Sequence, residues 1–264
     1  MTPDDCPWWA PPLLAVQFLT RVPVRRLDRL SAAQVSIGLV QAVGWFPLVG
    51  ALIGGITAAA AIAAAAIWPV VVAVLLALAI ESRLTGAFHE DAVADFCDAF
   101  GGGHTADDVR RIMKDSRIGS YGAVGLMLAL ALRAALLVAV IGRFDTVAAA
   151  SLIIASAAFG RLLAAVLMAV VPPAPAGTGL AKDIATGVGP RVLALAFVTA
   201  APAMLMLGLV APLAAVITGL AGLVFVLWFR ALLLRRIGGS TGDCLGFGAY
   251  AGQLLVLLAA VAAP

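Results

Sequence analysis

The segment from His89 to Phe100, HEDAVADFCDAF, is unusually acidic for the chain that surrounds it. It holds four Asp and Glu residues, whereas only 12% of the whole chain is charged and 63% is hydrophobic. No proline or glycine interrupts the segment, which predicts a helix that ends at the glycines that follow it. On a helix, Asp91, Asp95 and Asp98 lie at i, i+4 and i+7 and therefore share one face.

Three carboxylates on one helix face repel each other, and no Lys or Arg occurs between residues 84 and 109 to balance them. A divalent cation would relieve this repulsion, and oxygen-only ligands favour Mg²⁺ or Mn²⁺ over Zn²⁺. The spacing therefore predicts a metal site at Asp91, Asp95 and Asp98, with an exposed acidic face as the alternative. His89 lies about half a turn from this face, so we expect it to contact substrate or cap the helix.

A basic group follows the acidic one in the stretch RRIMKDSRIGSYG, residues 110–122. Lysine and arginine side chains bind phosphate, and arginine can do so through two parallel hydrogen bonds. Carboxylate-held Mg²⁺ beside cationic side chains is typical of phosphoryl transfer, in which positioning and charge neutralisation supply most of the catalysis. A basic flank that touches lipid headgroups is the alternative interpretation.

Two further polar segments are rich in glycine, namely GTGLAKD (177–183) and RRIGGSTGD (235–243). Glycine lets backbone N–H groups come close to phosphate oxygens, so both segments are candidates for substrate contact. Neither segment matches a Walker nucleotide-binding pattern, and each alone is also compatible with an ordinary turn.

The elements that must position these residues are membrane helices. The mean hydropathy is +1.10, and long runs carry almost no charge. About 20 apolar residues span a bilayer, and the chain lacks the alternating pattern of a transmembrane barrel. We expect an all-α polytopic membrane bundle, a single domain over residues 1–264, with a short N-terminal helix near 10–22. Seven spans are predicted, at 42–67, 69–88, 121–142, 147–171, 191–209, 213–234 and 247–263.

Seven spans place all the sizeable polar segments on one side of the membrane. Twelve of the 17 Lys and Arg residues lie on that side or at its edge, so the positive-inside rule predicts that it is cytoplasmic. Because a transporter needs access from both sides, this layout favours a membrane-anchored enzyme. The net charge of +3 gives no reason to expect nucleic acid as a partner. The predicted catalytic segments on this side are 89–120, 172–190 and 235–246.

Charged residues inside the spans need partners, because an isolated charge is costly in a bilayer. Glu81, Arg83 and Arg161 fall inside predicted spans. A buried pair of Glu81 with Arg83 or Arg161 is therefore expected beneath the polar side. The acidic helix of residues 87–100 is expected to continue the second span out of the bilayer.

Taken in order along the chain, the motifs resemble the adenosylcobinamide-GDP ribazoletransferase family, also called cobalamin-5′-phosphate synthases. The block from residue 89 to residue 122 is the most specific part, and the resemblance covers nearly the whole chain. The matching motifs are FLTRVPV (18–24), GWFPLVGALIGG (44–55), HEDAVADFCDAFGG (89–102), RRIMKDSRIGSYG (110–122), GTGLAKD (177–183) and RRIGGSTGDCLG (235–246).

The resemblance implies the reaction that completes adenosylcobalamin or its 5′-phosphate. A ribose 3′-hydroxyl of α-ribazole, or of its 5′-phosphate, attacks the cobinamide-bearing phosphorus of adenosylcobinamide-GDP, and GMP leaves. The family is a Mg²⁺-dependent integral enzyme of the bacterial inner membrane. Self-association, or association with other enzymes of cobalamin assembly, is compatible with this resemblance.

The resemblance also implies roles for individual residues. The acidic motif, His-x-Asp-Gly-x-x-Asp in the family, here contains Ala92 in place of its glycine, and Gln253 stands where a glutamate is expected. The implied catalytic residues are Asp91, Asp95, Asp98 and Asp115, the first three as metal ligands. The implied substrate-binding residues are His89, Lys114, Ser116, Arg117, Lys182, Asp183, Thr241 and Asp243.

Several alternatives stay open at this point. CDP-alcohol phosphotransferases also hold metals on helix-borne aspartates, but their motif needs glycine at 92 and does not tolerate Phe96. A divalent-cation transporter is the non-enzymatic alternative. Asp115 and Asp98 are both candidates for the general base, and the number of metal ions, one or two, is undetermined.

Overall fold

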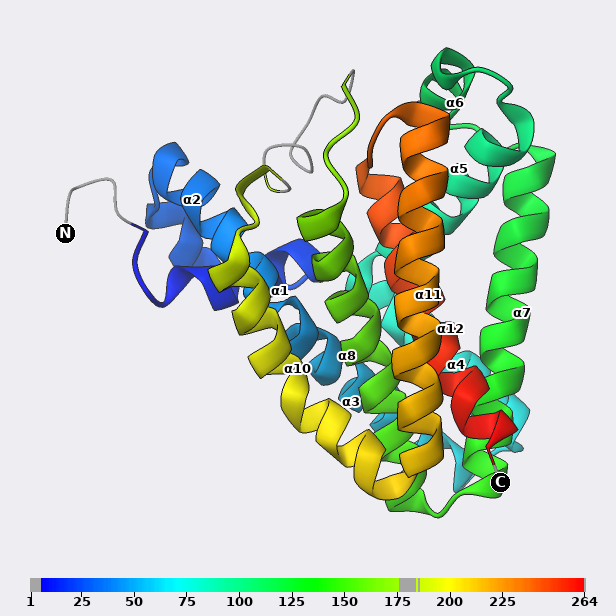
Figure 1. The fold of residues 1–264 in the computed structure, drawn as a ribbon. Helices are drawn as coiled ribbons and strands as arrows, with labels where there is room; N and C mark the ends of the chain where they lie inside the picture. Colours follow the sequence, from blue (N-terminus) through cyan, green and yellow to red (C-terminus); the bar gives the residue numbers. More distant parts are fainter. Residues whose placement is uncertain (1–5, 176–183, 185, 264) are drawn as a thin grey trace.

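The computed structural model describes residues 6–175, 184 and 186–263, and within them it is a bundle of helices without a β-sheet (Figure 1). Two short 3-10 helices, Arg25–Arg29 and Val43–Trp45, interrupt the N-terminal part. The α-helices are α1 (Ala10–Leu19), α2 (Ala32–Ala42), α3 (Phe46–Ala65), α4 (Val70–Thr85), α5 (Phe88–Gly102), α6 (Ala106–Ile112), α7 (Ser120–Arg143), α8 (Thr146–Val170), α10 (Pro190–Val210), α11 (Pro212–Ile237) and α12 (Gly242–Ala262).

The membrane architecture agrees with the sequence-based expectation. Among the described residues, six helical segments are long and apolar enough to cross a bilayer. The number becomes seven if α4 and α5 together are one broken span. The prediction of an all-α bundle of about seven spans, preceded by a short N-terminal helix, is confirmed.

Helix α8 forms the centre of the bundle. In its most apolar stretch 78% is buried within the protein, compared with 22% in α7, α10 and α11, which face outward. Glycines allow close approach on two sides of α8. A Cβ atom on Gly50 of α3 would lie 2.6 Å from the Ala157 carbonyl oxygen, and one on Gly160 would overlap the carbonyl oxygen of Ala249 in α12. Small residues at such contacts let membrane helices pack backbone to backbone.

The acidic helix α5 does not continue α4, contrary to our expectation. The chain turns by 89° between the two helices, because Gly86 and Ala87 both have positive φ, 74° and 57°. Glycine takes this conformation at little cost, whereas Ala87 needs support from its surroundings. The backbone N–H of Arg21 donates to the Leu84 carbonyl oxygen, and the Arg21 side chain lies against Gly86. The N-terminal segment therefore covers the break.

A buried ion pair joins three helices near this break. The carboxylate of Glu81 in α4 accepts hydrogen bonds from the guanidinium of Arg133 in α7, at 2.8 Å, and from the Thr57 hydroxyl of α3, at 2.7 Å. Arg133 also lies 3.6 Å from the carboxylate of Glu90, in the first turn of α5. The expected pairing of Glu81 with Arg83 or Arg161 was wrong. The cation paired with Glu81 is Arg133 of α7, which lies 52 residues later in the sequence.

The described polar connections gather at one end of the bundle, where Figure 1 shows α6 beside the turn between α11 and α12. Ser240 in this turn exchanges backbone hydrogen bonds with Pro172 and Ala174, which follow α8. Arg236 donates to the carbonyl oxygen of Gly103 at the end of α5. The segment expected as a loop at 235–246 is mostly helical, since α11 extends to Ile237 and α12 begins at Gly242.

We expect the buried ion pair to be a main determinant of stability. Arg133→Met should lower the free energy of unfolding by about 3–5 kcal/mol, because it leaves the buried Glu81 carboxylate without its counter-ion. The double variant Glu81→Met with Arg133→Met should recover much of this loss. Thermal unfolding of the detergent-purified protein measures the effect, with Arg83→Met, an exposed arginine of α4, as the matched control. Equal melting temperatures for Arg133→Met and the control would contradict the prediction.

Candidate functional site

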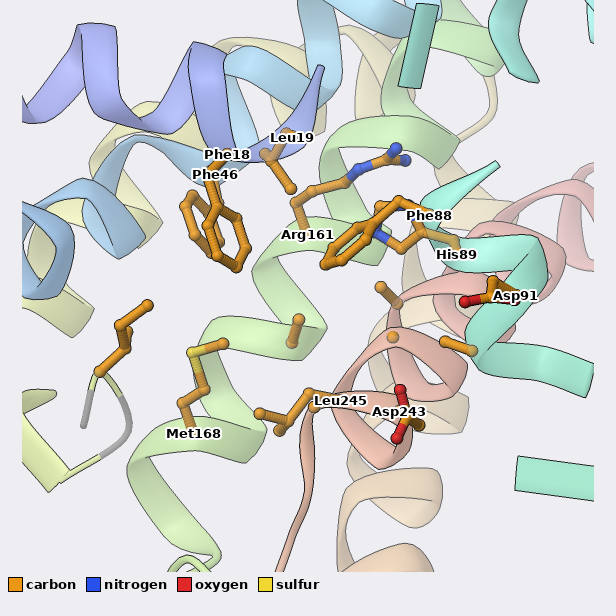
Figure 2. A pocket seen from close by; sticks show the side chains of 16 residues that line it. Phe18, Leu19, Phe46, Phe88, His89, Asp91, Arg161, Met168, Asp243 and Leu245 are labelled. Atoms are coloured by element: carbon orange, nitrogen blue, oxygen red, sulfur yellow. The ribbon is translucent and has the colours of Figure 1, made fainter. Parts of the chain in front are cut away.

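A cavity of about 300 Å³ lies among α1, α3, α5, α8 and α12 (Figure 2). Phe18, Phe46, Phe88 and His89 form one aromatic wall, in which the rings of Phe18 and Phe88 meet edge to face with centroids 5.5 Å apart (Figure 2). Met168 and Leu245 line it on a further side. Most of the lining is apolar, as in typical small-molecule sites.

Polar side chains line part of the same cavity. Asp91 of α5 and Asp243 of α12 lie on the side occupied by His89 in Figure 2. His89 is 4% exposed, and its ring meets that of Phe88 edge to face. The predicted contact of His89 with substrate stays a prediction. Arg161 of α8 is also a lining residue, and it is buried with its Nε atom unpartnered.

The carboxylates near the cavity form a cluster that spans two helices. Asp95 lies within electrostatic range of Asp91 and Asp98 of its own helix and of Asp243 of α12. Sequence analysis placed Asp243 among the substrate contacts, but not beside the acidic stripe. The separation of 148 residues gave no local signal for this neighbourhood, which arises because α5 packs against α12.

The fold of the turn before α12 explains how Asp243 reaches the site. The hydroxyl of Thr241 accepts a hydrogen bond from the Cys244 backbone N–H, at 3.4 Å, and so caps α12. Asp243 then lies in the first turn of the helix, where a negative charge is favourable. The Thr241 hydroxyl also lies 2.9 Å from the sulfur of Met113. Thr241, expected to bind substrate, therefore acts in this structure as the helix cap that places Asp243.

Asp98 has a role that its place on the acidic stripe did not indicate. Its two carboxylate oxygens accept hydrogen bonds from the backbone N–H groups of Gly119, at 2.6 Å, and Gly122, at 2.7 Å. A Cβ atom on either glycine would collide with the Asp98 carboxylate. The carboxylate thus satisfies free N–H groups at the start of α7. This contact differs from the metal-ligand role expected from the sequence.

The predicted three-aspartate metal site is not assembled as one ligand set. Within the described part of the chain, no group of three His, Cys, Asp or Glu side chains is arranged to hold one metal ion. The Asp98 carboxylate binds the start of α7, whereas Asp91 and Asp95 lie within electrostatic range of Asp243. Mg²⁺ is commonly held by one or two protein carboxylates together with substrate phosphates, so the remaining donor set suits that ion.

Arg117 of the basic group lines a second, open depression of about 460 Å³, together with Asp98 and Asp115. The Arg117 guanidinium donates to both carboxylate oxygens of Asp115, at 3.0 and 2.7 Å. These hydrogen bonds lower the pKa of the Asp115 carboxyl to about 2. A carboxylate with so low a pKa is a weak proton acceptor at neutral pH, which disfavours Asp115 as general base.

The other predicted contacts are placed as follows. Lys114 and Ser116 are exposed beside the Asp115–Arg117 pair. Lys182 and Asp183 lie outside the described residues. Ile184, which follows them, is buried and lines the cavity.

Comparison with known proteins decides the family. The profile described as "Cobalamin-5-phosphate synthase" matches residues 11–261. The chain belongs to the cobalamin-5-phosphate synthase family. It is 38% identical to the adenosylcobinamide-GDP ribazoletransferase of Ralstonia nicotianae over 246 residues, which is 92% of each chain. No solved structure matches the chain.

Two further relatives with the same name cover similar lengths. The Leptothrix cholodnii protein is 39% identical over 254 residues, covering 94% of this chain and 91% of the relative. The Vibrio parahaemolyticus protein is 36% identical over 251 residues, covering 95% of this chain and 91% of the relative. The likeness therefore extends over nearly the whole bundle.

The structure shows what surrounds Ala92 and Gln253, the two residues that depart from the family motif. Ala92 lies where α5 crosses α12, and a Cβ atom on Gly246 would come within 2.5 Å of the Ala92 methyl group. A small side chain at 92 is therefore matched by glycine on the opposite helix. Gln253 is 1% exposed, with its Oε1 atom unpartnered, and its Cγ atom packs near Gly160. A neutral amide thus occupies an interior position of the bundle.

The Asp98 contact leads to a test with a control on the same helix. Gly122→Ala should displace the Asp98 carboxylate, leave N–H groups at the start of α7 unpartnered and cost at least about 1 kcal/mol of stability. Gly142→Ala, near the other end of α7, introduces a Cβ atom into open space and should not destabilise the protein. Thermal unfolding in detergent compares the two variants. If both behave alike, the Asp98 carboxylate does not anchor α7.

Proposed function

We propose that this protein joins α-ribazole, or α-ribazole 5′-phosphate, to adenosylcobinamide-GDP and releases GMP, forming adenosylcobalamin or its 5′-phosphate. Family membership supports this reaction, and the relatives are named for it. The observation that carries the proposal is that Asp91 and Asp243 line the cavity, with Asp95 one helical turn from Asp91. This arrangement brings negative oxygen donors next to a space for a small substrate.

The proposed reaction is a single displacement at phosphorus. A ribose hydroxyl oxygen of ribazole forms a bond to the cobinamide-bearing phosphorus, and the bond from that phosphorus to the GMP oxygen breaks. The hydroxyl proton passes to a base, and GMP carries away the bonding electron pair. Positioning and charge neutralisation are the main catalytic demands of such a transfer.

Mg²⁺ is the proposed cofactor. Asp91 and Asp95 would hold it, with phosphate oxygens of adenosylcobinamide-GDP supplying further ligands. When bound, the ion neutralises charge on the phosphates. Asp98 is left out of this ligand set because both of its oxygens accept backbone hydrogen bonds.

Asp243 is the proposed base for the ribose hydroxyl. It lines the cavity and comes from a helix other than the one that carries Asp91 and Asp95. By contrast, Asp115 is held by Arg117 at the outer depression, and Asp98 is held by two glycines. A positioned base typically contributes a factor of about 10²–10⁴ to the rate.

The basic group of α6 and the following turn is proposed to receive the phosphates of the guanosine nucleotide. Three of its arginines pair with nearby aspartates, in the pairs Arg110–Asp107, Arg111–Asp108 and Arg117–Asp115. Exposed ion pairs of this kind contribute little stability. The arginines can therefore exchange their aspartate partners for substrate phosphate at small cost.

The cytoplasmic side of a bacterial inner membrane is the proposed location of the site. The polar end of the bundle carries most of the Lys and Arg residues of the chain, and the described connections at the opposite end are short. Positively charged segments favour the cytoplasmic face.

A turnover assay tests the proposal directly. Detergent-purified protein with adenosylcobinamide-GDP, α-ribazole 5′-phosphate and Mg²⁺ should release GMP and form one cobalamin phosphate per GMP. Asp91→Asn should lower kcat at least about 100-fold through loss of a charged group at the reacting phosphate. Asp28→Asn, at an exposed aspartate of the 3-10 helix Arg25–Arg29, should retain activity and serves as the control. CMP release from a CDP-alcohol, with no GMP from the corrinoid, would reject the proposal.

Removal of the metal provides a separate test. EDTA should abolish GMP release from the wild-type protein, and Mg²⁺ should restore it, because the substrate phosphates would otherwise face the aspartates without a counter-ion. Asp95→Asn should raise the Mg²⁺ concentration needed for half-maximal rate. Full activity in EDTA would contradict the proposed cofactor.

A further inference from the structure

The cavity is small compared with one of the two proposed substrates. Its volume of about 300 Å³ lies at the lower end of the range, roughly 300–1,000 Å³, that is typical of small-molecule pockets. Adenosylcobinamide-GDP contains a corrin ring, an adenosyl group and a guanosine nucleotide, and the whole molecule is too large to fit within such a volume. Ribazole, a single nucleoside, is of suitable size.

The apolar part of the cavity suits a flat, apolar ring system. Phe18 and Phe46 are stacked with ring centroids 5.4 Å apart and an interplanar angle of 12°. Phe88 meets Phe18 edge-on at 5.5 Å. Met168 and Leu245 supply further apolar surface. Aromatic rings favour stacked or edge-to-face contact with another ring, and methionine sulfur also packs well on aromatic groups.

The polar part of the cavity suits the sugar of the same molecule. Asp91 and Asp243 can accept hydrogen bonds from ribose hydroxyl groups, and His89 can exchange one. A nucleoside that places its base against Phe18 and Phe46 would direct its ribose toward Asp91 and Asp243, which lie on the other side of the cavity in Figure 2. The attacking hydroxyl would then lie beside the proposed phosphate site.

From these observations we infer that the cavity is the ribazole site and that its phenylalanine wall selects the base of the incoming nucleoside. The inference rests on the proposed function and extends it to substrate selection. The benzimidazole base of ribazole has an apolar outer edge that matches this wall. A purine base carries ring nitrogens and an amino group there, which would lose their hydrogen bonds to water against phenylalanine, methionine and leucine.

Two variants test the site from different directions. Ala164 lines the cavity from α8, so Ala164→Leu fills part of it and should raise the KM for α-ribazole at least 10-fold. Phe18→Leu removes a ring from the wall and should reduce the preference for α-ribazole over the α-linked adenine riboside at least 5-fold. Neither change should alter the KM for adenosylcobinamide-GDP. Phe225→Leu, which replaces a stacked ring of α11 outside the cavity, is the matched control.

The readouts are steady-state kinetics and isothermal titration calorimetry with α-ribazole, its 5′-phosphate or the adenine riboside. Calorimetry needs no second substrate, so it separates this inference from the proposed reaction. Binding of ribazole that is weakened by Ala164→Leu, but not by Phe225→Leu, supports the site whether or not turnover is seen. Turnover with unchanged ribazole KM and unchanged base preference in both cavity variants overturns the inference while leaving the proposed function intact. A wild-type protein that binds no ribazole also overturns it.

Discussion

The arrangement of the bundle depends on the need to pair charge inside an apolar protein. Glu81 and Arg133 are both almost fully buried, and the cost of burying either alone would be several kcal/mol. Their contact fixes α4 against α7, and Thr57 adds α3. Arg133 also approaches Glu90, which directly precedes Asp91 in α5. A structural ion pair thus holds the start of the helix that carries the candidate catalytic aspartates.

The sharp break before α5 gives the three aspartates different surroundings. Asp91 lines the cavity, Asp95 follows it one turn later, and Asp98 is bound by the glycines that begin α7. The helix therefore leads from a mostly apolar cavity to a more open polar depression. In the proposed function, this arrangement would let a small acceptor and a large phosphate-bearing donor approach the same carboxylates from different sides.

The sequence predicts features that depend on composition and local periodicity. Long apolar runs reveal the membrane helices, and the i, i+4, i+7 spacing reveals the acidic face of α5. The family resemblance, which depended most on residues 89–122, is confirmed by the family profile. The break at Gly86 was missed because a single glycine near a helix end is common, and nothing local indicates that Ala87 also adopts positive φ.

Long-range contacts account for the remaining differences. The pairing of Glu81 with Arg133, the meeting of Asp243 with the α5 aspartates and the binding of Asp98 to Gly119 all join segments distant in sequence. The cavity itself is built from five helices, so its size and its phenylalanine wall have no signature in any one segment. Periodicity can place a side chain on a face, but packing decides what that face meets.

A cryo-electron microscopy map of the protein in lipid nanodiscs tests the central claim most directly. The sample would contain the Asp243→Asn variant, to slow turnover, with adenosylcobinamide-GDP, α-ribazole and Mg²⁺. The account predicts ribazole density inside the cavity, its base against Phe18 and Phe46, its ribose beside Asp91, and the diphosphate outside near Asp95. Ribazole density on the outer surface, with the cavity closed or filled by lipid, would contradict the account.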